Sequence, residues 1–486
     1  MNATAQTGWQ WLDSQGYNNP LNPDGFFDQT YPGDYMVWNQ LLTSTDAVRK
    51  RAALALSEFF VVSLSGIELT WRAHAIAAWW DLLAAHAFGN FRTLLEAVTL
   101  NPAMGAWLNT RGNQKENSAG RLPDENYARE VMQLMTIGLV QLNPDGTERR
   151  DAQGNALPTY GEAEVSALAR VFTGYDFDMS QNVNTSVSGR TIPGTAYTRL
   201  PMVLNASRHS TLASTFLGTT VPANTPGAEA LRIALDTLFN HPNVGPFFGR
   251  QMIQRLVTSN PSPAYVARVA AAFNNNGAGV RGDLRAVFRA ILLDAEARSS
   301  AGLTQPAFGK VREPMVRFAQ WARTFGVSSA SNGWRIPATA DPARSLGQSP
   351  LRSPSVFNFF RPGYVPPSTA LATSKSVAPE FQIVNESSVA GYLNFMYDSL
   401  RFGLLNGDVK ASYSRELALV TDAAALVQRL NLMLCAGQLS ASTVTAIVSA
   451  LNTYPVTAAS STIDKLDRIA GAVLLVMACP EYLVQK

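Results

Sequence analysis

The sequence predicts a mainly helical (all-α) protein, a multi-helix irregular bundle with two long ordered loop regions and at most small β excursions. Apolar residues recur at helical spacing through most of the chain, as in Val48, Ala52, Leu56 and Phe60. Helix-capping and helix-breaking residues separate these stretches. No fixed-period repeat and no strand-turn-helix glycine motif is found, which argues against solenoid and nucleotide-binding folds.

Capping signals place many of the helix starts. Asn90 precedes one apolar periodic segment, and the pairs Asn101-Pro102 and Ser262-Pro263 open two others, because proline is tolerated in the first helical turn. A capping box over 159–162 opens a helix that ends near residue 173. Further helices are predicted over 72–88, 225–240, 245–257, 283–294, 313–325, 386–402, 415–434, 440–451 and 461–477.

Two long segments lack a helical pattern. Residues 176–206 are rich in Thr, Ser and Asn, and we interpret them as a functional loop or a small hairpin excursion. Residues 328–380 are rich in proline, but the aromatic stretch 356–360 indicates that they pack against the rest of the chain. We expect a single helical domain over 1–486, with 381–486 as its C-terminal helical part.

Composition excludes several classes of protein. Of the 486 residues, 46% are hydrophobic and 15% are charged, which is typical of a well-buried globular protein. A net charge of +3 without a long basic run provides no electrostatic basis for nucleic-acid binding. The longest apolar runs fall short of the roughly 20 residues of a membrane helix, so we expect no membrane span. We identify no signal segment in this chain.

The stretch 121–138 concentrates ionisable groups in an otherwise apolar segment. We expect a helix that starts at Pro123 or Asp124 and stops at Gly138. On it Glu125 and Arg129 share one stripe, and Glu130 lies on the neighbouring stripe. Two interpretations remain open: the charged groups form a structural network that fixes how helices meet, or Glu125 or Glu130 is a general base or a metal ligand.

The turn segment after this helix carries side chains that could ligate a cation. Asn143, Asp145 and Asp151 carry oxygen ligands of the kind that calcium prefers. The spacing of an EF-hand and its terminal glutamate are both missing. The sequence Leu142-Asn-Pro-Asp-Gly146 therefore indicates a turn.

Four motifs together resemble one bacterial protein family. They are Pro123-Asp-Glu-Asn-Tyr-Ala-Arg-Glu130, Phe172-Thr-Gly174, Ser353-Pro-Ser-Val-Phe-Asn-Phe-Phe-Arg-Pro362 and Cys479-Pro-Glu-Tyr482. The family is catalogued as "domain of unknown function 1800", and Asp124 is the one departure from its usual first motif. The resemblance implies a largely helical, exported (periplasmic or extracellular) bacterial protein. It also implies a neighbouring sulfatase-like partner of the family "domain of unknown function 1501". It implies no reaction.

Three of the four histidines fall where the resemblance leads us to expect histidine: His86, His209 and His241. Each has an ordinary structural interpretation, for example a helix end for His86. If the three met Glu125 or Glu130, they would form a site suited to a divalent transition metal such as zinc, iron or manganese. Sequence alone does not show that groups so far apart converge.

The two cysteines, Cys435 and Cys479, lie in the last helical part of the chain. They could be buried thiols that behave as small apolar groups, or a disulfide that ties down the C-terminal helix in an oxidising compartment. Both alternatives stay open. The spacing of Cys and His does not match a structural zinc site.

Two functional hypotheses follow, from different classes. The first is an exported interaction or accessory protein that works with the sulfatase-like partner and presents aromatic side chains on the loops 176–206 and 328–380. The second is a metal-dependent enzyme, a hydrolase or an oxidoreductase, centred on Glu125, Arg129 and Glu130. The sequence does not decide whether the chain is an enzyme.

Overall fold

The computed structural model describes residues 6–486, which form two compact units. Unit 1 comprises residues 6–33, Asp46–Gln305 and Ser353–Asn358. Unit 2 comprises Asp34–Thr45, Pro306–Arg352 and Phe359–Lys486. The described residues form 21 α-helices and ten strands of only two or three residues each, so the prediction of a mainly helical protein is confirmed.

Unit 1 contains most of the helices. It holds α1 (Gly8–Ser14), α3 (Ala47–Ser57), α4 (Arg72–His86), α5 (Phe91–Thr99), α6 (Pro102–Trp107), α7 (Asn126–Gln133), α8 (Glu162–Val171), α9 (Gly227–Asn240), α10 (Val244–Leu256), α11 (Pro263–Asn274), α12 (Leu284–Leu293) and α13 (Ala295–Arg298).

The predicted caps start three of these helices. Asn90 Oδ1 accepts from the Arg92 amide (2.9 Å) and Asn101 Oδ1 from the Ala103 amide (2.9 Å). Ser262 Oγ accepts from the Tyr265 amide (3.1 Å). Each side chain satisfies an amide that the first helical turn leaves without a partner.

A cluster of aromatic rings forms part of the core of unit 1. The Phe91 ring lies 5.1 Å from that of Phe248 and 5.3 Å from that of Phe273, measured between centroids, and Phe59 lies 5.1 Å from Phe248. These rings come from α5, α10 and α11 and from the segment after α3. Edge-to-face contacts of this kind contribute beyond the apolar area that they bury.

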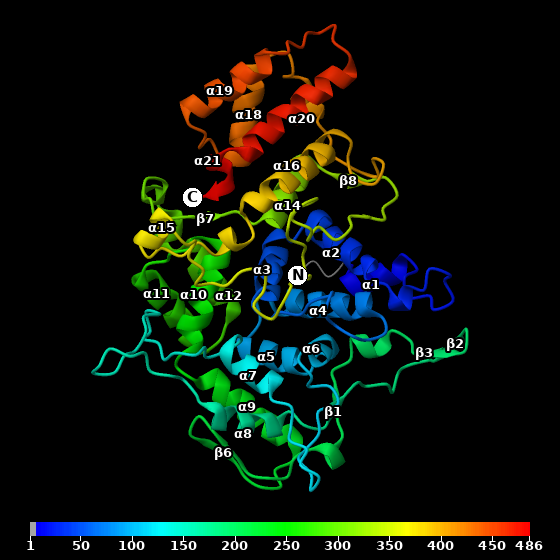
Figure 1. Cartoon of the computed structure of the whole chain (residues 1–486), viewed down its shortest axis with the longest axis vertical. Helices are drawn as coiled ribbons and strands as arrows, with labels where there is room; N and C mark the ends of the chain where they lie inside the picture. Colours follow the sequence, from blue (N-terminus) through cyan, green and yellow to red (C-terminus); the bar gives the residue numbers. More distant parts are fainter. Residues whose placement is uncertain (1–5) are drawn as a thin grey trace. The chain divides into compact units, whose positions relative to one another are not determined.

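The strands of unit 1 form three antiparallel pairs. They are β1 (Tyr175–Asp176) with β4 (Val203–Leu204), β2 (Thr185–Val187) with β3 (Arg190–Ile192), and β5 (Ser214–Phe216) with β6 (Thr219–Val221). The hairpin β2–β3 lies inside the segment 176–206 and extends away from the helices of unit 1 (Figure 1).

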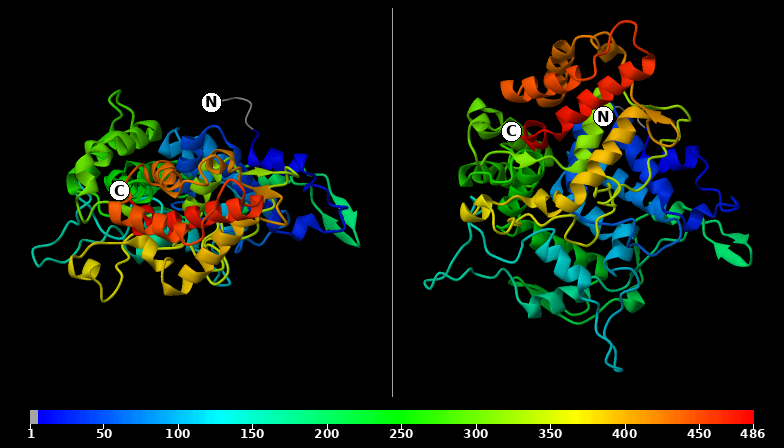
Figure 2. Two further views of the ribbon diagram at one scale, coloured as in Figure 1. Left: turned by 90° about the horizontal axis from the view of Figure 1, so that it is seen from above. Right: turned by 45° about the horizontal axis from the view of Figure 1, so that its top comes forward.

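Unit 2 contains the remaining helices and two strand pairs. It holds residues 34–43 of α2 (Tyr31–Thr43), α14 (Pro314–Thr324), α15 (Ala370–Thr373), α16 (Glu386–Arg401), α17 (Ser414–Leu417), α18 (Ala423–Cys435), α19 (Ala441–Asn452), α20 (Thr462–Ala478) and α21 (Pro480–Leu483). The strand pairs are β7 (Lys310–Val311) with β10 (Val484–Gln485) and β8 (Ser328–Ser329) with β9 (Val409–Lys410). Helices α18, α19 and α20 pack on one another, as Figures 1 and 2 show.

Two predicted helices differ from the observed ones. The segment 415–434 is broken, because Asp422 accepts from the Ala425 amide (2.9 Å) and starts a new helix there. The helix predicted to reach Gly138 ends at Gln133, because the amides of Ile137 and Gly138 both turn back to the Met132 carbonyl. None of the helices in residues 6–486 is long and apolar enough to cross a membrane.

Candidate functional site

The charged stretch begins at α7, where Glu125 is the residue before the first helical turn. Both of its carboxylate oxygens are engaged: Oε1 accepts from Ser166 Oγ (2.5 Å) and Oε2 from Arg129 Nη2 (3.2 Å). Ser166 lies on α8, so Glu125 links the two helices.

Arg129 extends this network to a second carboxylate. Its Nη2 lies 2.7 Å from Glu162 Oε1 and its Nη1 lies 3.1 Å from Oε2. The hydrogen bond from Arg129 lowers the pKa of Glu162. The side chains of Arg129, Glu125 and Glu162 are 37%, 34% and 70% exposed, so the network lies at the surface of unit 1 and is screened by water.

Glu130 is the one charged residue of α7 that is buried, with 8% of its surface exposed. Its Oε2 has no hydrogen-bond partner among the described residues. Burial raises the pKa of this carboxyl, and the opposing charge of Arg129 offsets only part of the effect. Nearby, the hydroxyl of Tyr160 is also buried without a partner in the described part of the chain, and burial raises its pKa to about 12.

His209 occupies a separate position at the end of α8. It is 5% exposed, and its Nδ1 donates to the Thr173 carbonyl (2.9 Å) because a carbonyl only accepts. The next residue, Ser210, donates from its amide to Thr173 Oγ1 (2.9 Å) and from Oγ to Glu116 Oε1 (2.8 Å). His209 therefore fastens the loop after β4 to the end of α8.

The other two histidines of the predicted metal set lie at other helix ends. His86 is the last residue of α4, and burial lowers its pKa. His241 follows α9, where its Nδ1 accepts from the Asn243 amide (3.2 Å), and burial and then Arg281 lower its pKa. Within residues 6–486 no three His, Cys, Asp or Glu side chains come together in a group that could hold a metal ion. The metal hypothesis gains no support from this arrangement.

The aromatic side chains of the two predicted loops pack inward. In 176–206, Tyr197 is 2% exposed and its hydroxyl donates to the Thr70 carbonyl. In 328–380, Trp334, Phe359 and Phe360 are also buried. The expectation that these loops present their aromatic residues is therefore wrong for most of them, because burying the rings is favourable. Phe357 is an exception, at 39% exposure.

A feature not anticipated from the sequence is the segment 139–160, which we call the lobe. It is folded by main-chain hydrogen bonds among three residues that are eight positions apart: Gln141 N to Leu157 O (2.8 Å), Arg149 N to Gln141 O (2.8 Å) and Leu157 N to Arg149 O (2.9 Å). Of its 22 residues only Gly146 is buried. The lobe is ordered without a core of its own.

Two tight turns complete the lobe. Asp145 Oδ1 accepts from the Thr147 amide (3.0 Å), and Asp151 Oδ1 accepts from the amides of Gln153 (2.9 Å) and Asn155 (2.8 Å). These bonds confirm that the segment from Leu142 forms a turn. Side chains that bond the main chain two residues further on are a common way to hold a turn without hydrophobic packing.

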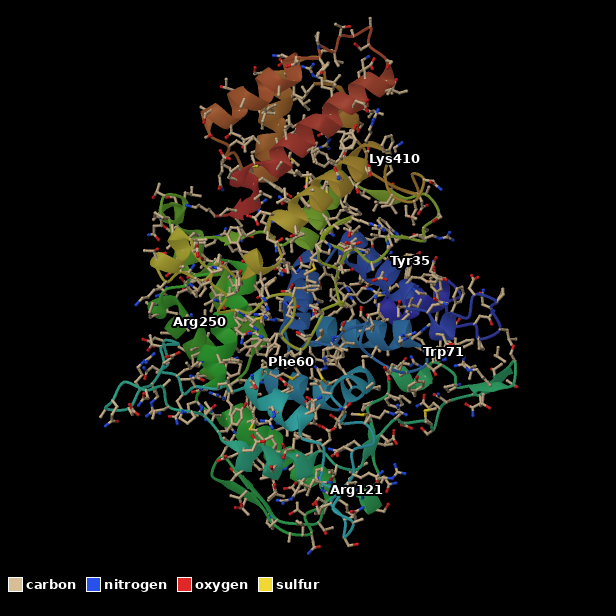
Figure 3. The ribbon with its side chains drawn as sticks, in the orientation of Figure 1. Tyr35, Phe60, Trp71, Arg121, Arg250 and Lys410 are labelled. Carbon is tan, nitrogen blue, oxygen red and sulfur yellow. The ribbon has the colours of Figure 1, made fainter. Side chains whose placement is uncertain are left out.

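The lobe is fixed to the helices at its base. Asn243 of unit 1 donates from Nδ2 to the carbonyls of Ile137 (2.8 Å) and Val140 (2.8 Å) and accepts from the Leu142 amide (2.9 Å). The lobe projects from the helices of unit 1 in Figures 1 and 2, where it runs from cyan to teal. A second projecting loop of this unit carries Arg121, labelled in Figure 3.

The cysteines are buried free thiols at the ends of α18 and α20. They interact directly: the Cys479 side chain raises the pKa of the Cys435 thiol, and the hydrogen bond from Cys435 lowers the pKa of Cys479. Cys479 Sγ also lies 3.0 Å from the Val476 carbonyl. Of the two alternatives for Cys435 and Cys479, the structure therefore shows two buried thiols and no disulfide between them.

The molecule is thus a mainly helical protein of two units, with a polar network between α7 and α8 and projecting ordered loops. The family model described as "Protein of unknown function (DUF1800)" matches residues 28–484, and the chain belongs to this family. Comparison with curated proteins and with solved structures gave no match.

Proposed function

We propose that this protein is an exported accessory protein that binds a sulfatase-like partner of the family "domain of unknown function 1501", and that the lobe 139–160 is the contacting element. The observation that carries the proposal is the lobe itself. Its side chains are exposed or half-buried, so the core of unit 1 does not require it. Ordered loops on a rigid frame are where binding residues concentrate.

The chemistry of the lobe also supports binding. Between its two turns the lobe carries Glu148, Arg149 and Arg150, all exposed. The base is fixed by Asn243 and the turns by Asp145 and Asp151, so little entropy is lost when a partner orders the surface. Export and the identity of the partner rest on the family resemblance.

The test is co-purification from the native host. The tagged wild-type chain is expected to retain the sulfatase-like protein. The variant E148S/R149S/R150S is expected to lose it, because complementary charges across an interface determine which partner binds. Immunodetection in periplasmic and culture fractions tests export.

A matched control separates recognition from a general charge effect. The variant E229S/R232S/R298S removes one acidic and two basic side chains from exposed sites of the same unit and is expected to retain the partner. If the wild-type chain does not retain the sulfatase-like partner, the proposal is wrong. If both variants lose the partner equally, the lobe is not the contacting element.

A further inference from the structure

A shallow groove runs along α11 and α12 of unit 1, with a cavity volume of about 700 Å³. Its floor is made of small side chains, Ala272 on α11 and Ala286 and Ala290 on α12. Ala286, Ala290 and Leu293 follow one another at helical spacing, so they form one stripe. Leu293 closes the end of the stripe and is 61% exposed.

The rim of the groove is positively charged. Arg285 and Arg289 lie one turn apart on α12, and neither guanidinium has a hydrogen-bonding or ion-pair partner among the residues that the structure describes. Arg268 on the facing helix is different, because Asp294 holds it through two hydrogen bonds (2.7 and 2.8 Å).

The acidic groups of the groove are already engaged. Asp294 is committed to Arg268, and Asp283 accepts from Asn276 Nδ2 (2.8 Å) and from the Arg285 amide (2.9 Å). Three arginines and two aspartates therefore line the groove, so its net charge is positive. The two arginines without partners are available to bind an acidic group. Arginine forks match carboxylates well.

We propose that this groove binds an acidic segment of a partner protein that carries apolar side chains between its carboxylates. The carboxylates pair with Arg285 and Arg289, and an apolar side chain covers the alanine floor and Leu293. A bare polyanion such as a sulfated polysaccharide would use the arginines but leave the apolar floor uncovered, which is why a peptide is the occupant that fits. The groove is distinct from the lobe, so the inference does not rest on the proposed partner.

The experiment measures binding of a fluorescein-labelled peptide of four Glu-Glu-Leu repeats to the full chain by fluorescence anisotropy. We expect saturable binding that weakens with added salt, because exposed charges are screened. The variant R285E/R289E should weaken binding at least about tenfold, since like charges then face each other. L293S should weaken it by a smaller factor with charge unchanged.

Matched controls make the result decisive. R250E/R298E reverses two exposed arginines of the same unit that do not line the groove, and it should leave the dissociation constant within about twofold. A peptide of Glu-Glu-Ser repeats should bind more weakly than the leucine peptide. Absence of binding by the wild-type chain, equal loss in both arginine variants, or equal affinity for the serine peptide or dextran sulfate would each overturn the proposal.

Discussion

The guanidinium of Arg129 on α7 holds both carboxylate oxygens of Glu162, the first residue of α8. Since Glu162 is 70% exposed and Arg129 is 37% exposed, the pair lies in water at the surface of unit 1. The charged face of α7 therefore aligns two helices, while the opposite face carries the packing. Val131, which is fully buried, lies on that opposite face, and Met132 next to it in the chain is also fully buried.

Replacing Arg129 by Ala should change the stability of the chain little. Exposed ion pairs contribute little because water and salt screen them. The pKa of Glu162, which Arg129 lowers, should rise towards its usual value, as NMR titration would show. Met132 on the same helix is fully buried, and Met132→Ala should cost about 2–5 kcal/mol in urea unfolding. A larger loss for the arginine variant than for the methionine variant would contradict this division.

Glu130→Gln should stabilise the chain at neutral pH by about 1 kcal/mol, because it removes a buried charge whose Oε2 lacks a partner in the described chain. Burial raises the pKa of Glu130 above its unfolded value, so the folded state binds the proton more tightly. Protonation of Glu130 therefore increases the free energy of unfolding. This increase is fully present below the pKa that Glu130 has in the unfolded chain, and it is lost as pH rises through the pKa that Glu130 has in the folded chain.

The variant Glu130→Gln should therefore be more stable than the wild type at pH 7, and this difference in the free energy of unfolding should shrink as pH falls towards 5. The difference between the two proteins isolates this group from other titrating carboxyls. Glu68→Gln, at an exposed site of the same unit, is the matched control variant. A pH-independent difference would contradict a raised pKa at Glu130.

Much of the helical architecture was predictable because capping and periodicity are local signals. Asn90, Asn101 and Ser262 each start a helix where expected. Whether His86, His209 and His241 converge on Glu125 was not predictable, because which distant groups meet depends on packing, and in the structure they do not form a cluster. Each histidine instead has a local environment of its own.

The lobe was missed for a different reason. Its three hydrogen-bonded residues, Gln141, Arg149 and Leu157, follow neither the helical nor the strand pattern of apolar residues. The available signal was the repeated turn, with Asp145-Gly146 and Gln153-Gly154 eight residues apart. Turns alone do not indicate how a segment folds between them.

His209→Ala should destabilise the chain by about 2–4 kcal/mol, because it removes a buried ring and its hydrogen bond to the Thr173 carbonyl. His86→Ala, at a half-buried position, should cost less than about 1 kcal/mol. Elemental analysis of both variants, purified without chelator, should match the wild type. A stoichiometric transition metal lost with His209 would instead support a metal site.

Thiol titration of the unfolded chain should find two free thiols. Cys435 and Cys479 are buried thiols that interact through their sulfur atoms, and burial protects them from solution oxidants. Mass analysis under non-reducing conditions, with alkylation after unfolding, measures this directly. Detection of an intramolecular disulfide would overturn the thiol form.

Lys310→Met should be among the most destabilising single changes in unit 2. Lys310 Nζ lies 3.4 Å from Glu313 Oε1 and 3.0 Å from Glu380 Oε1, and all three side chains are at most 2% exposed. The substitution leaves two buried carboxylates without their shared cation, which costs about 3–5 kcal/mol. Urea unfolding measures the loss. Two carboxylates share one lysine, and burial raises the pKa of Glu380. Glu380→Gln removes one of the two negative charges, so it should destabilise the chain far less than Lys310→Met does. If the two variants were equally unstable, the shared lysine would not be what holds these carboxylates in the core.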